Sequence, residues 1–200
     1  KMDEGGAEFA GATAENLGAT YAEAREERTE ANALVMKNGV IKASSYDSIR
    51  GIGIRFIVNK KLGFVSTNDL TKKRIKDILE KAIKITKGTK DLAEDTYLSK
   101  EKTAKATYEV KQKKKLANVG IEEKIALLKE SENAIKATKV QVPSRYIVLA
   151  DADTSEYFCN TDGSKILAHI PRMHFYYFLT IAAKQKVVQR YWVYGATGGW

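Results

Sequence analysis

The chain has 200 residues, which is enough for one large domain or two small ones with a buried core. Its 44% hydrophobic and 30% charged residues are typical of a soluble globular protein, and no apolar run approaches the length of a membrane span. The first six residues show no secretory signal, and a single cysteine, Cys159, excludes an internal disulfide framework and fits a reducing cytosol. We therefore expect a cytoplasmic protein with no membrane partner.

The net charge of +9 suggests a nucleic-acid partner, but the distribution of the charge does not favour one. Residues 1–30 carry eight acidic and three basic side chains, whereas residues 100–115 carry seven lysines and two glutamates. Sheets that bind nucleic acid interleave aromatic and basic residues on one face. Tyr108 is the only aromatic residue in the lysine-rich run, so we interpret this run as a solvated linker.

The chain begins with a predicted helix and a predicted hairpin. Apolar residues at helical spacing predict a helix over residues 7–18, and Gly18 is placed to end it. A long strand follows from residue 21 toward residue 36. Asn38-Gly39 predicts a type I′ turn, because both residues tolerate a positive φ. The turn places four apolar residues on one face, with Met36 opposite Ile41 and Leu34 opposite Ala43.

A second hairpin and a second helix come next. Residues 52–58 alternate as in a half-buried strand, residues 59–61 turn the chain, and residues 62–66 form the returning strand. Asp69 or Thr71 caps a helix that Gly88 ends. One stripe of this helix is apolar, and it consists of Ile75, Ile78, Leu79, Ala82 and Ile83.

Residues 89–118 are polar and without hydrophobic period, and we interpret them as a linker or a crossover loop. A helix from about Gly120 then carries Glu122 and Glu123 at its positive N-terminal end. Its apolar stripe consists of Ile121, Ile125, Leu128 and Ile135. Pro143 precedes strands that we predict over residues 146–150, 156–160, 165–168, 172–183 and 187–194, with turns at Asp162-Gly163 and at residues 184–186.

The second part of the chain repeats the first in this prediction. Aligning the turn residues Gly39 and Gly163 gives an offset of 124 residues, which places residues 52–58 over residues 176–182. The predicted fold class is α+β with α/β-type layers, in two similar halves that each combine a helix with an antiparallel sheet. The predicted divisions are 1–88, a lysine-rich linker over 89–118, and 119–200.

No residue pattern in the sequence supports a catalytic, cofactor-binding or metal site. Gly51 and Gly53 lack the third glycine and the following helix of a dinucleotide loop, so we interpret them as sites of close strand packing. His169 and His174 are five residues apart in a predicted strand and therefore point to opposite faces. A site that combines Cys159 with a histidine stays open, although two half-exposed histidines and a buried thiol are the favoured interpretation.

Nucleophilic and acid–base catalysis also find no support in the residues. The Gly-x-Ser-x-Gly motif is absent, and only two histidines exist to serve a triad. Three acidic pairs occur without an arguable pocket, namely Glu26/Glu27, Glu122/Glu123 and Asp151/Asp153. On its residues alone the chain is a β-rich binding or scaffold module.

Several motifs, in their order and spacing, resemble the N-terminal region of the TldD/PmbA family, the modulator of DNA gyrase proteins that are regarded as zinc metallopeptidases. They cover nearly the whole chain and lie at residues 17–25, 37–69, 121–128, 158–163, 170–172 and 195–200. Two departures are the lysine-rich tail and Cys159, where a small aliphatic residue is expected.

The resemblance implies a cytoplasmic, zinc-dependent hydrolase that acts as a homodimer or as a heterodimer with a paralogue and cleaves unfolded or extended peptides. In the family a His-Glu-x-x-x-His helix follows a Gly-Gly-Trp segment, and this chain ends at Gly198-Gly199-Trp200. We therefore expect the zinc and the catalytic residues in the complete protein but none in this chain, which should be inactive alone. We assign the chain a role in dimerisation and in forming the substrate cavity. A catalytically silent partner subunit and a DNA-associated regulatory protein are the alternatives.

The C-terminal strand is a predicted binding edge. Tyr191, Trp192 and Tyr194 supply aromatic area that a monomer rarely leaves in water, and the small residues 195–199 let another backbone approach. We expect Trp192 or Trp200 to be buried only by another chain or by downstream sequence.

Overall fold

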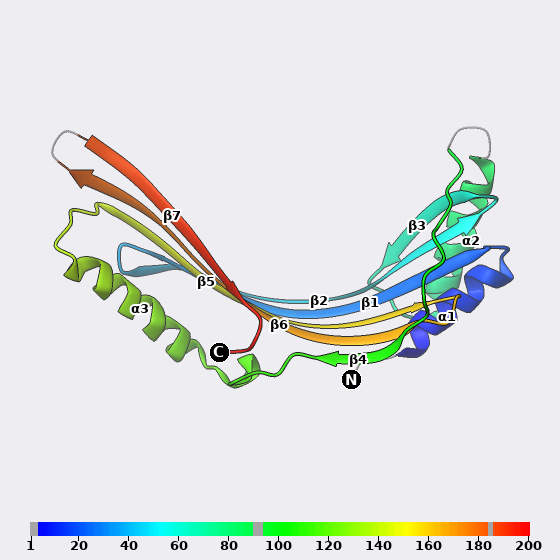
Figure 1. The fold of residues 1–200 in the computed structure, drawn as a ribbon, viewed down its shortest axis with the longest axis horizontal. Helices are drawn as coiled ribbons and strands as arrows, with labels where there is room; N and C mark the ends of the chain where they lie inside the picture. The colour runs from blue at the N-terminus through cyan, green and yellow to red at the C-terminus, as the bar shows by residue number, and fades with distance from the viewer. Residues whose placement is uncertain (1–3, 90–93, 184–185) are drawn as a thin grey trace. The chain divides into compact units, whose positions relative to one another are not determined.

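The computed structural model describes residues 4–89, 94–183 and 186–200, which form an α+β fold (Figure 1). This confirms the predicted fold class. The helices are α1 (Glu4–Asn16), α2 (Lys72–Gly88), the short 3₁₀ helix η1 (Leu116–Asn118) and α3 (Ile121–Ala137). The strands are β1 (Tyr21–Lys37), β2 (Val40–Val58), β3 (Lys61–Thr67), β4 (Lys105–Glu109), β5 (Ser144–Asn160), β6 (Lys165–Ala183) and β7 (Lys186–Ala196).

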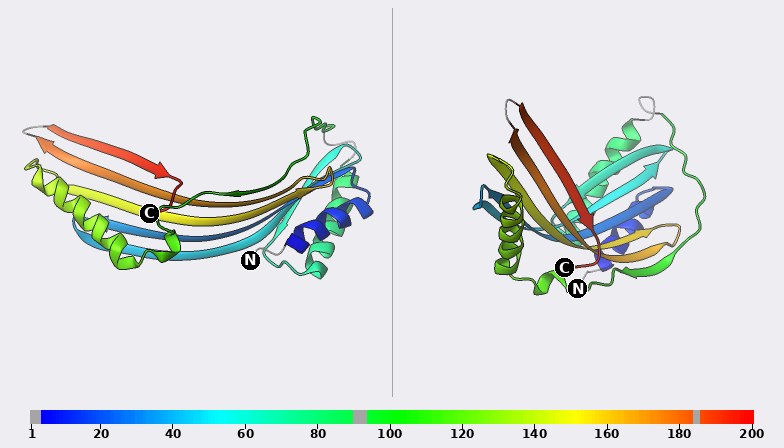
Figure 2. Two further views of the ribbon diagram at one scale, coloured as in Figure 1. Left: turned by 60° about the horizontal axis from the view of Figure 1, so that its bottom comes forward. Right: turned by 60° about the vertical axis from the view of Figure 1, so that its left-hand side comes forward.

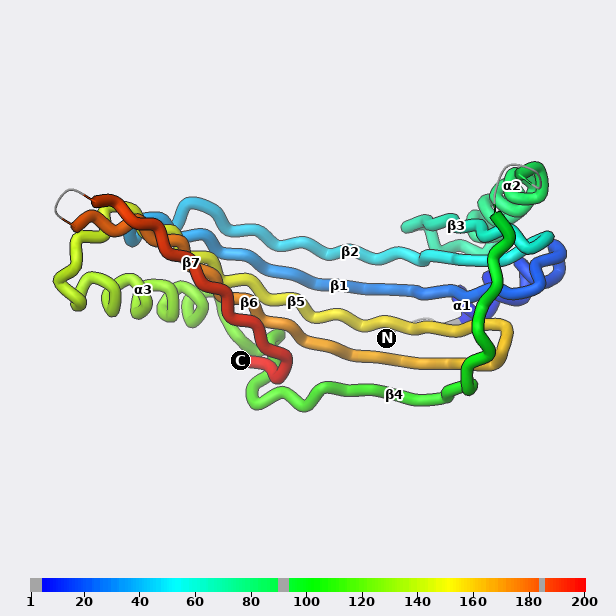
Figure 3. The backbone as a smooth tube through the Cα atoms, turned by 45° about the horizontal axis from the view of Figure 1, so that its top comes forward, coloured from blue at the N-terminus to red at the C-terminus, as the bar shows by residue number. Residues whose placement is uncertain are grey.

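All described strands belong to one sheet with the order β3-β2-β1-β5-β6-β4, and β7 also pairs with β6 (Figure 3). The pairs β2/β3 and β6/β7 are antiparallel. β4 runs parallel to β6, with Lys105 beside Lys165 and Glu109 beside His169. The predicted linker over residues 89–118 therefore contains a strand, although its residues 90–93 lie outside the described part of the chain.

The order of elements repeats along the chain, as the sequence predicted. α1-β1-β2-β3 is followed by α3-β5-β6-β7, and β1 and β5 each have 17 residues while β2 and β6 each have 19. The turn residues Gly39 and Gly163, which set the predicted offset, have φ values of 82° and 100°. Both turns thus use glycine for a backbone conformation that other residues rarely adopt.

The chain forms two compact units, and each is built from several segments. Unit 1 contains residues 1–28, 49–109 and 155–169, and unit 2 contains residues 29–48, 110–154 and 170–200. The four long strands contribute to both units. The division into 1–88, 89–118 and 119–200 stays a prediction about how the sequence repeats.

In unit 1 the helices α1 and α2 pack on one face of the sheet. Small residues of α1, such as Ala10 and Ala14, are fully buried and let the helix approach the strands. Thr71 caps α2, because its side chain accepts a hydrogen bond from the backbone N–H of Arg74, and Asp69 in turn binds the backbone of Thr71. The predicted stripe of α2 is confirmed, with Ile75, Ile78, Leu79 and Ile83 buried and Ala82 half-buried.

In unit 2 the helix α3 covers one face of the strands (Figure 2). Its Leu128 packs with Leu34 and Met36 of β1 and with Ile147 and Leu149 of β5. The Asn38-Gly39 turn is confirmed, since both residues have a positive φ. Two details differ from the prediction: Ala43 is exposed, and Ile121, at the first turn of α3, is 43% exposed.

The strands are longer than predicted because polar residues do not interrupt them. Residues 43–50 of β2 are all exposed, and they continue the strand that begins at Val40. β5 likewise joins two predicted strands through Asp151 and Thr154, whose polar groups are paired inside unit 2. Hydrogen bonding to neighbouring strands holds such segments whatever their side chains are. None of the helices that the structure describes is long and apolar enough to cross a membrane.

Candidate functional site

The residues considered for metal binding lie on β5 and β6. Cys159 is buried in the core of unit 1, His169 is half-buried, and His174 is exposed opposite Gly195 of β7. Among the residues that the structure describes, no three His, Cys, Asp or Glu side chains form a group that could hold a metal ion. Burial, as the largest cause, raises the pKa of the Cys159 thiol to about 11, and the nearby carboxylate of Glu8 adds to the shift. The thiolate needed for a nucleophile or a metal ligand is therefore disfavoured.

Two of the acidic pairs contain a carboxylate that serves the structure. Glu26 is 1% exposed and accepts hydrogen bonds from Nε and Nη2 of Arg50 at 3.2 and 2.8 Å. Asp151 is also buried, and its Oδ2 lies 2.6 Å from Nζ of Lys124. Glu26 thus holds an exposed arginine and Asp151 a buried lysine, and neither carboxylate lines the groove over β1, β2 and β3 or the groove between α2 and β3.

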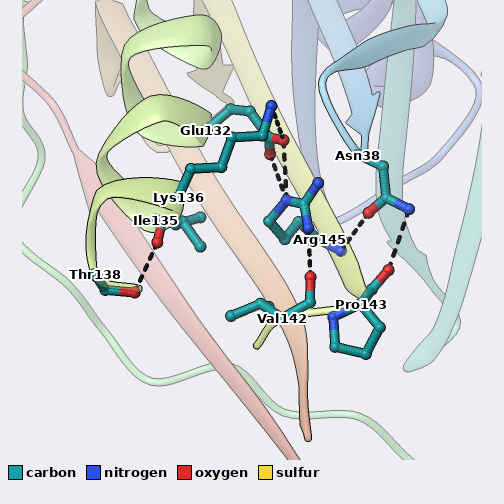
Figure 4. A network of polar contacts seen from close by, with 8 residues as sticks. All are labelled: Asn38, Glu132, Ile135, Lys136, Thr138, Val142, Pro143 and Arg145. Atoms are coloured by element: carbon teal, nitrogen blue, oxygen red, sulfur yellow. Dashed lines mark hydrogen bonds and ion pairs between the residues drawn. The ribbon is translucent and has the colours of Figure 1, made fainter. Parts of the chain in front are cut away.

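A third buried carboxylate, Glu132 of α3, fixes the β1–β2 turn in unit 2 (Figure 4). Arg145 donates from Nε to both oxygens of Glu132 at 2.9 and 3.0 Å, and its backbone N–H donates to Oδ1 of Asn38 at 2.8 Å. A Cβ at Gly39 would lie 3.3 Å from Oε1 of Glu132, so the glycine also gives the carboxylate room. The Asn38-Gly39 pair thus has a tertiary role beside its turn geometry.

Gly51 and Gly53 lie in a groove on the face of unit 1 that α1 and α2 leave open. The groove has a volume of about 660 Å³. A Cβ at Gly53 would lie 3.3 Å from the ring of Phe64, so this glycine permits the close strand packing that the sequence suggested. Two arginines beside the groove are paired with carboxylates. Nη2 of Arg55 lies 2.6 Å from Oε1 of Glu23. Arg25 forms a salt bridge with Glu156, and its guanidinium lies over the ring of Phe158. Paired charges leave this groove no net attraction for an ion.

The strongest candidate for binding is an aromatic face on unit 2. Met173, Phe175 and Tyr177 of β6 face α3, so alternation along the strand places Tyr176 and Phe178 on the opposite face. Two residues of β7 lie on the same face, because Tyr191 is opposite Phe178 and Val193 is opposite Tyr176 in the antiparallel pair. Tyr146 of β5 joins them, since its ring contacts that of Tyr176. We call this set (Tyr146, Tyr176, Phe178, Tyr191 and Val193) the aromatic face. α3 is the one α-helix among the described residues of unit 2, and it lies on the other face.

β7 borders the aromatic face and is exposed along its whole length. Val187, Tyr191 and Trp192 are 70%, 66% and 59% exposed, which is unusual for large apolar side chains in a strand. β6 is its one strand partner within the described chain. β7 therefore combines backbone groups without a strand partner on its outer side with apolar side chains on both faces, which is typical of a strand that another chain covers.

The two tryptophans behave differently. Trp192 is exposed, so the expectation that another chain or downstream sequence buries it stays a prediction, whereas Trp200 is partly buried by the core of unit 2. The backbone N–H of Trp200 donates to the carbonyl of Lys114 at 2.9 Å, and Lys113 donates to Gly198. Gly199 has a φ of 79°, and a Cβ there would clash with the Lys114 carbonyl. The lysine-rich segment thus holds the Gly-Gly-Trp segment, a contact that the sequence did not suggest.

Comparison with known proteins shows which family this α+β module resembles. Residues 22–86 match the sequence model of PmbA/TldA metallopeptidase domain 1. A metalloprotease of Methanocaldococcus jannaschii is 26% identical over 157 residues, which cover 78% of this chain and 34% of that protein. The resemblance to the TldD/PmbA family is thereby confirmed.

Solved structures show the same fold. A protein from Bacteroides thetaiotaomicron described as a modulator of DNA gyrase aligns with a TM-score of 0.81 and 18% identity, over 96% of this chain and 44% of its own. TldE from Thermococcus kodakarensis aligns with a TM-score of 0.74 and 16% identity, over 95% of this chain and 42% of its own. The chain thus spans about a third of the curated relative and less than half of these solved chains.

Proposed function

We propose that this chain is the N-terminal part of a TldD/PmbA-like zinc metallopeptidase that hydrolyses unfolded or extended peptides in the cytoplasm. In this proposal the chain makes dimer contacts and lines the cavity that receives the substrate. The carrying observation is the aromatic face of unit 2 with the exposed strand β7, together with the match of residues 22–86 to metallopeptidase domain 1. Such a surface is too apolar to stay in water, and its strand edge suits a partner in extended conformation.

A dimer contact through β7 has a preferred geometry. Lys186 and Arg190 are the charged residues of the strand, and both are positive. In an antiparallel pair of two copies centred on Arg190, the two guanidinium groups would lie opposite each other and repel. Centring the pair on Tyr191 places Arg190 opposite Trp192 of the second copy, where a cation–π contact forms instead. Pairing with a paralogue uses the same edge.

An extended peptide can use the same features because its recognition needs little sequence information. Main-chain hydrogen bonds to a strand edge are independent of side chains, while alternate side chains reach the aromatic rings. This suits an enzyme that acts on unfolded segments of many sequences. Zinc would supply the hydrolytic chemistry by activating water and polarising the scissile carbonyl. The described residues of this chain do not fit the ion, since they contain no group of three ligands, and no hydrolytic step is assigned to them.

The proposal is tested on the complete gene product. We expect stoichiometric zinc, cleavage of an unfolded casein-type substrate with much slower cleavage of the same protein when folded, and a dimer by size-exclusion chromatography with light scattering. Trp192→Glu should weaken the dimer or raise KM, because it places a charge on the exposed apolar edge strand β7. Tyr108→Glu is the matched control, since Tyr108 is also 59% exposed but lies on β4 in unit 1.

The alternatives give different results in the same experiment. A dimer without zinc and without hydrolysis would instead support a catalytically silent partner subunit. Binding of DNA that weakens steeply with salt, with no peptide cleavage, would support a DNA-associated regulatory protein.

A further inference from the structure

In unit 1 helix α2 packs against strand β3, and the two elements lie side by side in Figure 3. A groove lies between them. The groove between these two elements has a volume of about 410 Å³. Arg74, Ile78, Lys81 and Ile85 line it from the helix, and Phe64 lines it from the strand. Helical residues spaced by four, three and four positions share one face, so these four side chains form a continuous row along α2.

The row alternates positive and apolar side chains. Ile78 is 7% exposed and forms part of the floor, whereas Ile85 is 69% exposed at the groove. An exposed apolar side chain above a buried one in a concave surface indicates a place where another apolar side chain is buried.

The groove is also electropositive. α2 carries seven lysine and arginine residues against Asp77 and Glu80, and Glu80 pairs with Lys76 outside the groove. Arg74 and Lys81 are the charged lining residues, and neither forms a salt bridge with a residue that the structure describes. Arg74 lies near enough to Asp69 to contribute, as the smallest cause, to the lowered pKa of that carboxyl. The groove therefore attracts an anionic partner.

The strand side of the groove offers backbone groups. β3 is the last strand at its end of the sheet, and among the described residues β2 is its one strand partner. A strand edge beside a helix is the arrangement in which an extended peptide adds to the sheet and places alternate side chains against the helix.

We propose that this groove is a docking site for an extended acidic peptide segment. The segment adds to β3 as a strand, its carboxylates pair with Arg74 and Lys81, and an apolar side chain between them lies against Ile78 and Ile85. A basic rim selects acidic segments, and a free strand edge selects extended ones. The site is separate from the aromatic face and does not depend on peptidase activity.

The test uses the complete chain and a fluorescein-labelled nine-residue peptide in which glutamate alternates with valine and leucine. We expect saturable binding in fluorescence anisotropy. The double variant Arg74→Glu/Lys81→Glu and the single variant Ile85→Glu should each weaken binding by about tenfold. Lys76→Glu is the matched control on the opposite side of α2 and should change affinity by less than about twofold. Far-UV circular dichroism checks that each variant is folded.

Two further peptides and one single-stranded oligonucleotide complete the test. A peptide with lysine in place of glutamate should not bind, and a peptide with alternate N-methylated amides should bind about tenfold more weakly or not at all, because it cannot add as a strand. Equal binding of either peptide, or an equal effect of Lys76→Glu, would overturn the proposal. Absence of binding at 0.1 mM peptide, which is roughly the affinity of a weak docking contact, would also overturn it. Self-association through the groove would do the same, as would displacement of the peptide by a lower concentration of a single-stranded oligonucleotide.

Discussion

The buried ion pair in unit 2 gives the sharpest prediction about stability. Nζ of Lys124 lies 2.6 Å from Oδ2 of Asp151, and the two side chains are 5% and 4% exposed. Asn32 donates a hydrogen bond to Oδ1 of the aspartate at 3.2 Å, while Oδ2 has no partner other than the ammonium among the described residues. Lys124→Met keeps the length of the side chain and leaves a buried carboxylate with one neutral donor.

Lys124→Met should lower the free energy of unfolding strongly, because the charge of Asp151 remains buried. Removing one partner of a buried pair destabilises a protein by about 3–5 kcal/mol. For a chain of this size, each kcal/mol lowers Tm by about 2–4 °C, so we expect a decrease of roughly 10 °C. The double variant Lys124→Met/Asp151→Leu removes both charges and should recover to within about 1–2 kcal/mol of the parent, since an unpaired Asn32 amide is then the main loss.

Urea unfolding followed by circular dichroism measures these differences. Lys76→Met is the control, because Lys76 pairs with Glu80 at 3.8 Å on the exposed side of α2 and its removal should change the free energy of unfolding by less than about 0.5 kcal/mol. The reasoning is refuted if Lys124→Met loses less than about 1 kcal/mol, or if the double variant is as unstable as the single one.

Three other predictions follow from unit 1. Cys159 should react with a thiol reagent slowly in the folded chain and rapidly in urea, because burial raises its pKa to about 11; equal rates in both states would contradict this. Glu8 accepts hydrogen bonds from Lys165 and Tyr157, which lower its pKa, so its stabilising effect is present above the ordinary glutamate pKa and is lost as the pH falls through the lowered value. The free energy of unfolding of Glu8→Gln should therefore be lower than that of the parent at neutral pH and equal to it at pH 2. A difference that is the same at both pH values would argue against the assignment. Gly63→Ala should destabilise by about 1–3 kcal/mol, because its Cβ would overlap the Phe56 ring, while Gly88→Ala has free space and should be neutral or slightly stabilising in thermal unfolding.

The local elements could be predicted because their signals are short-range. Asn38-Gly39 forms its turn through the positive φ of both residues, Gly18 ends α1 with a φ of 96°, and Thr71 caps α2 with its own side chain. Such features depend on neighbours within a few residues. The repeated order of helix and strands and the family resemblance were also readable, because both rest on the order and spacing of such signals.

The extent of the strands could not be read from side-chain alternation. Residues 43–50 are exposed on both faces, and Asp151 and Thr154 are polar, so hydrophobic period ends where the strand continues. What holds these segments is hydrogen bonding to neighbouring strands that lie far away in the sequence. The parallel pairing of β4 with β6 is a further example, since its lysine-rich sequence carries no period at all.

The candidate binding surfaces divide in the same way. The sequence by itself determined that β7 is aromatic and that α2 has one apolar stripe and many cations, because composition and spacing are properties of the chain. Only the tertiary structure decided that α3 leaves the aromatic face open, that Trp200 packs on its own unit, and that Arg74 and Lys81 lie beside an edge of β3 with no strand partner among the described residues. Whether a side chain is covered depends on which distant segment packs against it, and that follows from the sum of many weak contacts rather than from any one pattern of residues.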